Sequence, residues 1–211
     1  MTLKLPDSGA ETLPDGRRIP PSAQRNADPI LQILQSLGLH GTLLELASGS
    51  GLHAAHMAPV LGVTWQPTDV DPTNLPSIRA WAATAPNILP PILLDATKPG
   101  WSKTTGPHNA ILLVNLLHLI PTPAAATLLA ELPHALTPDG TACLYGPFLR
   151  NGQPTSPGDA AFDASLRAQN PEIGYKDLSW VAAQLTQSGL TTQITPMPAN
   201  NLMLVARHSN S

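Results

Sequence analysis

Charged residues are scarce in this sequence of 211 residues, at 12% of the chain against about 25% in an ordinary globular domain. This scarcity excludes a coiled coil or a helical rod laced with ion pairs. The 11 Lys and Arg residues form no basic stripe and the net charge is −3, so we expect no nucleic-acid partner. No apolar run approaches the ~18 residues that a membrane span needs, so we also expect no membrane partner.

Cysteine is nearly absent, and the one residue, Cys143, cannot form an internal disulfide. That fits a reducing compartment, and we expect a cytoplasmic protein. Proline is abundant, with 24 residues that must keep helices and strands short. Pro, Gly and Asp dominate residues 1–22, which are predicted to be a flexible N-terminal arm. Residues 23–211 are predicted to form a single domain.

Short apolar segments alternate along the chain with segments whose apolar residues recur at helical spacing. Strands are expected at residues 41–47, 63–69, 88–94, 110–115, 141–145, 190–195 and 202–206. The helices between them are expected at residues 29–37, 52–58, 75–85, 123–136 and 177–188, with turns or loops at 138–140 and 151–159. This order predicts an α/β fold with a Rossmann-like, doubly wound, seven-stranded sheet that is mostly parallel. The short link at 196–200 predicts that the last two strands form an antiparallel hairpin.

The segment Glu45-Leu46-Ala47-Ser48-Gly49-Ser50-Gly51 has the character of a ligand-binding loop between a strand and a helix. Its glycines let the backbone approach a ligand, and the helix that follows offers free N–H groups. The spacing Gly49-x-Gly51-x-x-Ala54 also fits the dinucleotide fingerprint, so an NAD(P)-binding oxidoreductase is the alternative. Glu45 decides between them, because its carboxylate would repel a pyrophosphate but would accept the ammonium and sulfonium of S-adenosylmethionine.

Two further acids stand at the ends of the next two expected strands. Asp69 is placed to accept hydrogen bonds from both hydroxyls of a ribose, and Asp95, followed by Ala96, is placed to reach an adenine amino group. The alternative is that each acid caps a helix or a turn. One acid after each of three successive strands favours a shared ligand.

The chain resembles a family of small class I methyltransferase-like proteins of uncharacterised function, which includes methyltransferase-like protein 26. The resemblance extends from residue 23 to the end of the chain. The segments that carry it are Ala23-Gln24-Arg25-Asn26, Pro29-Ile30, Leu44 to His56, Trp65-Gln66-Pro67-Thr68-Asp69, Asn115 to Pro121, Leu144-Tyr145-Gly146-Pro147-Phe148, Phe162 to Arg167 and Met197 to Leu202. The resemblance implies a class I fold and methyl transfer, without a settled substrate. Ala47, where many methyltransferases have glycine, is usual in this family.

The predicted cofactor-binding residues lie around the glycine loop and at the strand ends. They are Arg25, Asn26, Glu45, Ala47, Ser48, Gly49, Gly51, His53, Asp69, Asp95, Ala96 and Asn115. Besides the acids, two more of them have other interpretations: Asn26, like Asp28, could be the N-cap of a helix, and His53 could pack beside the loop together with His56. The resemblance favours Arg25 pairing with a carboxylate of cofactor or substrate. No metal site is predicted, because His53 and His56 lack a recognisable third ligand.

The predicted catalytic residues are His118, Asn115, Tyr145 and Arg25. Methyl transfer needs alignment of the nucleophile and exclusion of water, and a base only where the nucleophile must lose a proton. His118 follows the fourth strand and could be that base, or it could pack against the next helix. Tyr145 could donate to the substrate or close the core. We also expect the N-terminal segment to fold over the cofactor as a lid.

These features predict an S-adenosylmethionine-dependent methyltransferase that acts on a small molecule. A catalytically silent, cofactor-binding scaffold subunit is a further alternative. The sequence is also compatible with a homodimer.

Overall fold

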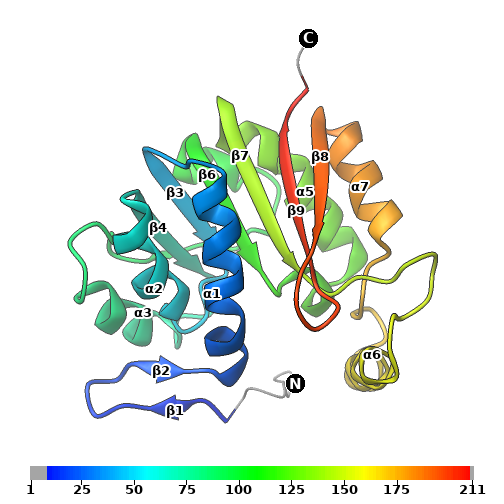
Figure 1. Cartoon of the computed structure of the whole chain (residues 1–211), viewed down its shortest axis with the longest axis horizontal. Helices are drawn as coiled ribbons and strands as arrows, with labels where there is room; N and C mark the ends of the chain where they lie inside the picture. Colours follow the sequence, from blue (N-terminus) through cyan, green and yellow to red (C-terminus); the bar gives the residue numbers. More distant parts are fainter. Residues whose placement is uncertain (1–8, 210–211) are drawn as a thin grey trace. The chain divides into compact units, whose positions relative to one another are not determined.

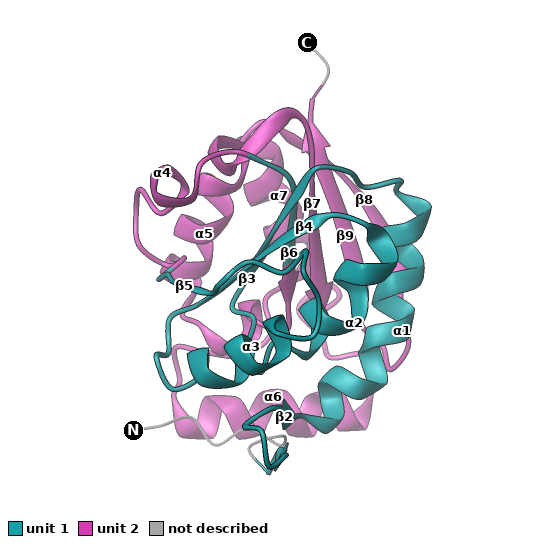
Figure 2. Ribbon diagram, turned by 90° about the vertical axis from the view of Figure 1, so that its left-hand side faces the viewer, with its two compact units in different colours: residues 1–95, 108–112 teal, residues 96–107, 113–211 magenta. Residues whose placement is uncertain are grey.

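The computed structural model describes residues 9–209. It confirms the α/β fold: a seven-stranded, mostly parallel sheet has the strand order β5-β4-β3-β6-β7-β9-β8 and ends in antiparallel strands. The order reverses beside β3, and ligands of such sheets bind beyond the carboxyl ends of the strands at that point. The described residues up to Asp95, with His108–Leu112, form one compact unit, and Ala96–Pro107 with the residues from Leu113 onward form a second (Figure 2).

Unit 1 contains the first strands of the parallel sheet and the helices next to them (Figure 1). In chain order its elements are β1 (Glu11–Thr12), β2 (Arg18–Ile19), α1 (Pro21–Ser36), β3 (Thr42–Leu46), α2 (Leu52–Leu61), β4 (Thr64–Asp69), α3 (Leu75–Ala82), β5 (Ile92–Leu93) and the first residues of β6 (His108–Val114). Strands β3 and β4 pair in parallel with Leu43 opposite Trp65, and β4 continues to β5 with Asp69 opposite Leu93.

Unit 2 contains the last three strands, with α5 and α7 packed on them (Figure 1). Its elements are α4 (Ser102–Thr105), the 3-10 helix η1 (Leu117–Leu119), α5 (Thr122–Ala135), β7 (Leu136–Gly146), α6 (Pro157–Gln169), α7 (Leu178–Gln187), β8 (Leu190–Pro196) and β9 (Leu202–His208). The predicted terminal hairpin is confirmed, because β8 and β9 are antiparallel with Ile194 opposite Leu204.

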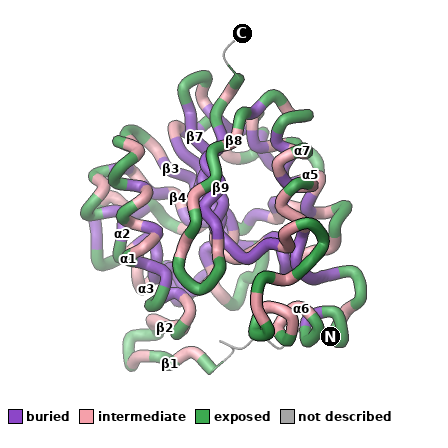
Figure 3. The backbone as a smooth tube through the Cα atoms, turned by 45° about the vertical axis from the view of Figure 1, so that its right-hand side comes forward, coloured by how far each residue is buried: buried purple, intermediate pink, exposed green. Residues whose placement is uncertain are grey.

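The core follows β3, β4, β6, β7 and β9, which are buried along most of their lengths, whereas the edge strand β8 is largely exposed or half-buried (Figure 3). In β6 the four residues from Ala110 to Leu113 are each at most 1% exposed, as expected for a parallel strand covered on both faces. Among residues 9–209, no helix combines the length and the apolar character needed to cross a bilayer.

The N-terminal segment differs from the predicted loop. Strands β1 and β2 pair as an antiparallel hairpin with Glu11 opposite Ile19, while residues 1–8 of the predicted arm lie outside the described part. The turn Pro14-Asp15-Gly16 reverses the chain, and Gly16 has the positive φ of 88° that such a turn uses. Strands of two residues carry too little apolar alternation to be recognised in a sequence.

Helix α1 begins eight residues before the predicted start, at Pro21, with Pro29 inside it. The prediction took Pro29 as a helix start because proline removes one backbone hydrogen bond from a helix interior. The helix nevertheless continues through Pro29 and buries one face, made of Ala23, Asn26, Ala27, Ile30 and Leu34. The interpretation of Asn26 or Asp28 as an N-cap is therefore wrong.

Two further elements differ from the prediction. The expected turn at Pro138-Asp139-Gly140 is part of β7, which starts directly after α5. Helix α6 begins within residues expected to be a loop, and the rest of it was not predicted. Its start does carry a sequence signal, since Ser156 is an N-cap whose side chain accepts from the backbone N–H of Asp159, and Pro157 occupies the first turn.

Candidate functional site

The glycine loop connects β3 to α2 through residues with left-handed backbone conformations. Ala47, Gly49 and Gly51 have φ values of 54°, 59° and 89°. A Cβ on Gly51 would lie 2.8 Å from the Cα of Ile78, so only glycine fits there. A Cβ on Gly49 would meet no atom of the described residues within 4 Å. The backbone at Gly49 therefore faces open space, as a ligand-binding loop requires.

Hydrogen bonds to the end of β4 hold this loop in place. The N–H of Ser48 donates to the carbonyl of Thr68 at 2.7 Å, and the N–H of Thr68 donates to the hydroxyl of Ser48 at 3.1 Å. The hydroxyl of Thr68 donates to the carbonyl of Glu45 at 2.8 Å. Ser48 and Thr68 are both buried, so these bonds are shielded from water and fix the loop before any ligand arrives.

Asp69 stands at the end of β4 with its carboxylate against the loop. It is 4% exposed, and its Oδ2 accepts from the N–H of Gly49 at 2.8 Å. Its Oδ1 accepts from the N–H of Asp71 at 2.9 Å and from Nδ2 of Asn74 at 3.1 Å. A carboxylate offers about four acceptor positions, so these three donors leave one lone pair on Oδ2 without a donor. The structure thus brings the predicted ribose acid to the glycine loop.

Glu45 lies beneath the loop, inside the core, at 1% exposure. Its Oε2 accepts from the indole N–H of Trp65 at 3.0 Å, and its Oε1 lies 3.8 Å from Nδ1 of His53. Burial raises the pKa of Glu45 to about 7, while the hydrogen bond from Trp65 works in the opposite direction. Burial also lowers the pKa of His53 to about 4. Glu45 therefore supports the loop from within, and its charge responds to any cation placed nearby.

Two histidines of α2 join it to α1. Nε2 of His53 lies 2.7 Å from Oδ1 of Asn26, and Nε2 of His56 lies 2.7 Å from Oδ1 of Asp28. These contacts fit the interpretation in which both histidines make polar packing contacts beside the loop. Arg25 is exposed on α1. Within residues 9–209 no three His, Cys, Asp or Glu side chains gather as metal ligands would.

Asn115 and Tyr145 lie in unit 2, at the ends of β6 and β7. Asn115 has a positive φ of 56°, and its N–H donates to the carbonyl of Tyr145 at 2.9 Å. A left-handed backbone at a residue other than glycine costs energy and is concentrated at functional sites. Tyr145 is 6% exposed, which fits its alternative role of closing the core. Asp95 is half-buried in unit 1 and Ala96 is buried in unit 2.

His118 is buried in unit 2, where it packs against buried Tyr175 and half-buried Phe162. Its ring is 5.8 Å from those of both Phe162 and Tyr175, in edge-to-face geometry. Burial, and then the charge of Lys176, lower the pKa of His118 to about 3. Such an imidazole is neutral at pH 7 and is a weak base. The geometry favours the packing role of His118 over the role of general base.

Sequence reasoning missed two polar residues beside the loop. Asn74 follows Asp69 by five residues and bonds to it, and Arg18 of β2 donates to the carbonyl of Gly49 at 3.4 Å. The sequence does contain a signal for Asn74, because it is a polar residue in the connection from β4 to α3, only five residues after Asp69. Arg18 carried no such signal, because it lies in the segment that was predicted to be an arm.

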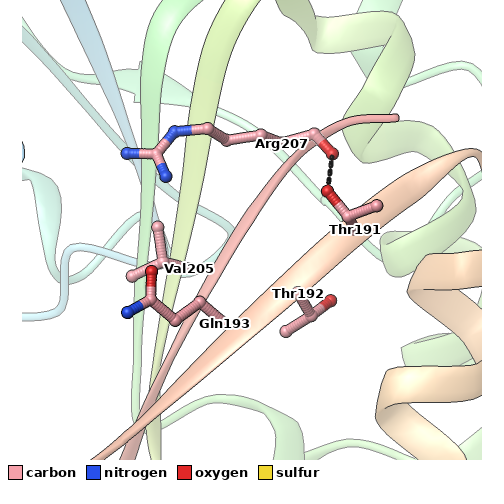
Figure 4. Close-up of a pocket in the computed structure, with 5 residues that line it drawn as sticks. All are labelled: Thr191, Thr192, Gln193, Val205 and Arg207. Carbon is pink, nitrogen blue, oxygen red and sulfur yellow. Dashed lines mark hydrogen bonds between the residues drawn. The ribbon is translucent and has the colours of Figure 1, made fainter. Parts of the chain in front are cut away.

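A shallow groove lies elsewhere, on the terminal hairpin of β8 and β9 (Figure 4). Its volume is about 240 Å³, and its lining residues are Thr191, Thr192, Gln193, Val205 and Arg207. Arg207 is the only titratable group that lines it. Since an arginine cannot take up a proton near neutral pH, this groove has no base to offer a nucleophile, and the glycine loop is the better candidate site.

Ala47 provides a test of the loop conformation. Because its φ of 54° strains an L-residue, Ala47→Gly should raise the free energy of unfolding by about 0.5–1 kcal/mol, despite the added freedom of glycine in the unfolded chain. Chemical denaturation followed by circular dichroism measures this. Ala130→Gly, at an exposed position within α5, is the control and should instead lose about 1 kcal/mol. An equal loss in both variants would contradict the strained loop.

Comparisons with known proteins identify the family of the chain and its fold. The profile of a family described as "Protein of unknown function (DUF938)" matches residues 17–208. An O-methyltransferase family protein from Burkholderia thailandensis is similar in structure, with a TM-score of 0.76, 16% identity, and coverage of 90% of this chain and 58% of that chain. The structure of human N-acetylserotonin methyltransferase in complex with SAM is also similar, with a TM-score of 0.75 and 16% identity. The match covers 90% of this chain and 53% of that chain. The chain thus spans little more than half of these two proteins.

A third similar structure is a complex between the Haloferax volcanii Trm112 methyltransferase activator and the putative methyltransferase. Its TM-score is 0.71 at 12% identity, with 89% of this chain and 92% of that chain covered. At these identities the likeness establishes a shared fold.

Proposed function

The chain belongs to the DUF938 family, whose function is unknown, and from its class I methyltransferase fold we propose that it is an S-adenosylmethionine-dependent methyltransferase. The observation that carries this proposal is Asp69 at the end of β4, bonded to the N–H of Gly49 with an acceptor position left on Oδ2. In sheets of this kind an acid at that place binds ribose hydroxyls. We also propose that the chain is a member of the family that includes methyltransferase-like protein 26, which its sequence resembles.

The residues around the loop fit this cofactor. The backbone at Gly49 faces open space, and Asp69 stands beside it for the ribose. Glu45 lies below the loop with a raised pKa, so a nearby ammonium or sulfonium would favour its ionised form. The cofactor would supply an electrophilic methyl group. Asp95, Ala96 and Asn115 are proposed as further contacts, and Arg25 as the partner of a carboxylate.

We propose a small molecule as the methyl acceptor. Two features support this: the charge is slightly negative, which is unsuited to nucleic acid, and several similar structures are named O-methyltransferases. Since His118 is buried and weakly basic, an acceptor that is already ionised, such as a thiolate or a phenolate, suits the chain best. Alignment of such an acceptor and exclusion of water would then supply the catalysis.

A second candidate is a cofactor-binding subunit that acts with a partner protein. One similar structure is a methyltransferase bound to an activator protein, which favours this candidate. A silent subunit would bind the cofactor through Asp69 and Gly49 but transfer no methyl group alone. A homodimer is a further proposal, and size-exclusion chromatography with light scattering tests both kinds of assembly.

Cofactor titration tests the proposal. We expect S-adenosylhomocysteine to bind with a Kd on the order of micromolar, because the loop and Asp69 are already formed. NADH should not bind, because the carboxylate of Glu45 at the end of β3 would repel its pyrophosphate. Isothermal titration calorimetry with both ligands measures this. Binding of NADH without S-adenosylhomocysteine would support the oxidoreductase alternative and contradict the proposal.

A further inference from the structure

Four residues around the proposed ribose site form a closed ring of hydrogen bonds. Nη2 of Arg18 donates both to the carbonyl of Gly49 and to Oδ1 of Asn74. Nδ2 of Asn74 donates to Asp69, and the N–H of Gly49 donates to the other oxygen of the same carboxylate. The ring joins residues from β2, the glycine loop, the end of β4 and the start of α3, all within unit 1.

The chemistry of the ring fixes the orientation of the Asn74 amide. A guanidinium only donates hydrogen bonds, whereas a carboxylate only accepts them. Since Asn74 stands between the two, its Oδ1 must face Arg18 and its NH₂ must face Asp69. A flipped amide would lose both bonds, so Arg18 holds the NH₂ group of Asn74 on the ribose side.

The acceptor positions of Asp69 show what this NH₂ group can do. Its Oδ2 has one donor, the N–H of Gly49, while Oδ1 has two, the N–H of Asp71 and Nδ2 of Asn74. One ribose hydroxyl fits on Oδ2 without displacing any donor. A second hydroxyl on Oδ1 must displace the side-chain donor of Asn74, since the backbone N–H of Asp71 is the less mobile. A hydroxyl also accepts hydrogen bonds, so the displaced NH₂ can donate to the oxygen of that same hydroxyl.

We infer that Asn74 is a ribose-binding residue and that Arg18, from the N-terminal hairpin, is its positioning residue. This inference rests on the proposed function, because it requires an adenosine-containing ligand at Asp69. It also ties the hairpin to the site, as expected for a lid.

Substitutions of Arg18 and Arg17 can distinguish loss of the hydrogen-bond ring from undocking of the hairpin formed by β1 and β2. The backbone N–H of Arg18 donates to the hydroxyl of Ser77 at 3.0 Å, and its carbonyl accepts from the indole of Trp81 at 3.1 Å. Both bonds survive in Arg18→Ala, so the hairpin stays docked. Arg17→Ala is the matched control, because Arg17 lies over the ring of Trp81 at 4.6 Å and bonds to Asp15, outside the ring of four.

The test is isothermal titration of S-adenosylhomocysteine into the wild type, Arg18→Ala, Asn74→Ala, the double variant and Arg17→Ala. We expect a loss of affinity of about three- to tenfold for each of the two ring variants, and a double variant that is little worse than either, since the two residues act through one another. Arg17→Ala should bind as the wild type does. Competition by adenosine and by 2′,3′-dideoxyadenosine adds a readout of the ribose contact. The ratio by which adenosine binds more tightly than 2′,3′-dideoxyadenosine should be smaller in both ring variants than in the wild type.

Three results would overturn the inference. They are unchanged affinity in both ring variants, an equal loss in Arg17→Ala, and a weaker affinity with an unchanged preference for adenosine. The last would mean that Asn74 acts on the fold of the loop and makes no ribose contact. A wild type that binds neither S-adenosylhomocysteine nor adenosine would refute the proposed function and this inference with it.

Discussion

Asp69→Ala should weaken the binding of S-adenosylhomocysteine by about ten- to a hundredfold. The substitution removes the acceptor for the ribose hydroxyls and leaves the N–H of Gly49 and the amide of Asn74 without their partner. An unpaired polar group in a buried site costs roughly 1–3 kcal/mol, which corresponds to this range of affinity. Isothermal titration on folded protein measures the change.

Asp71→Ala is the matched control for Asp69. Asp71 is the nearest acid in the sequence, but it is exposed and its carboxylate bonds to Thr73. We expect its affinity to stay within about twofold of the wild type, as for most surface substitutions. Asp69→Asn keeps one acceptor for the N–H of Gly49, so its affinity for S-adenosylhomocysteine should lie between those of Asp69→Ala and Asp71→Ala. If Asp69→Ala melts as the wild type does and binds the ligand unchanged, the ribose lies elsewhere.

His118→Ala should lower the free energy of unfolding by about 3 kcal/mol. The substitution leaves a cavity beside Phe162 and Tyr175, and large-to-small changes at buried aromatic sites cost about this much. Thermal and urea denaturation measure the loss. The exposed His134 of α5 is the control, and His134→Ala should change stability by less than about 0.5 kcal/mol. A general base would instead show itself as a turnover about 10²–10⁴-fold lower with unchanged stability.

The packing role of His118 also predicts a pH dependence with a definite sign. Its pKa is lowered in the folded state to about 3, from an ordinary value of 6.5. Between these values the unfolded chain binds the proton more strongly, so the stabilisation is complete above about pH 6.5 and is lost as the pH falls toward 3. His118→Phe keeps a ring but cannot titrate, so its stability should fall less than that of the wild type over this range. If the free energy of unfolding fell with decreasing pH to the same extent in the wild type and in His118→Phe, the buried, neutral imidazole would be contradicted.

Much of the fold could be predicted because its signals are local. The apolar strand at Ala110–Leu113 and the hairpin of β8 and β9 are visible as short runs bounded by turn residues, and both are confirmed. The misses lie where tertiary contacts override a local rule. Pro29 is tolerated inside α1 because the helix buries a continuous face, and β7 extends through Pro138 although proline and glycine usually mark a turn.

The sequence by itself determined the glycine loop, the acids at the ends of β3 and β4 and just after β5, and the alternation that puts strand ends at one edge of a parallel sheet. These depend on spacing along the chain. Only the tertiary structure decided which partners the polar side chains take: Glu45 faces Trp65 and His53, and Arg18 holds Asn74 beside Asp69. Arg18 and Asn74 are 56 residues apart, and no local periodicity encodes such a contact. It forms because folding brings the hairpin, the loop and α3 together, where buried donors and acceptors must find partners.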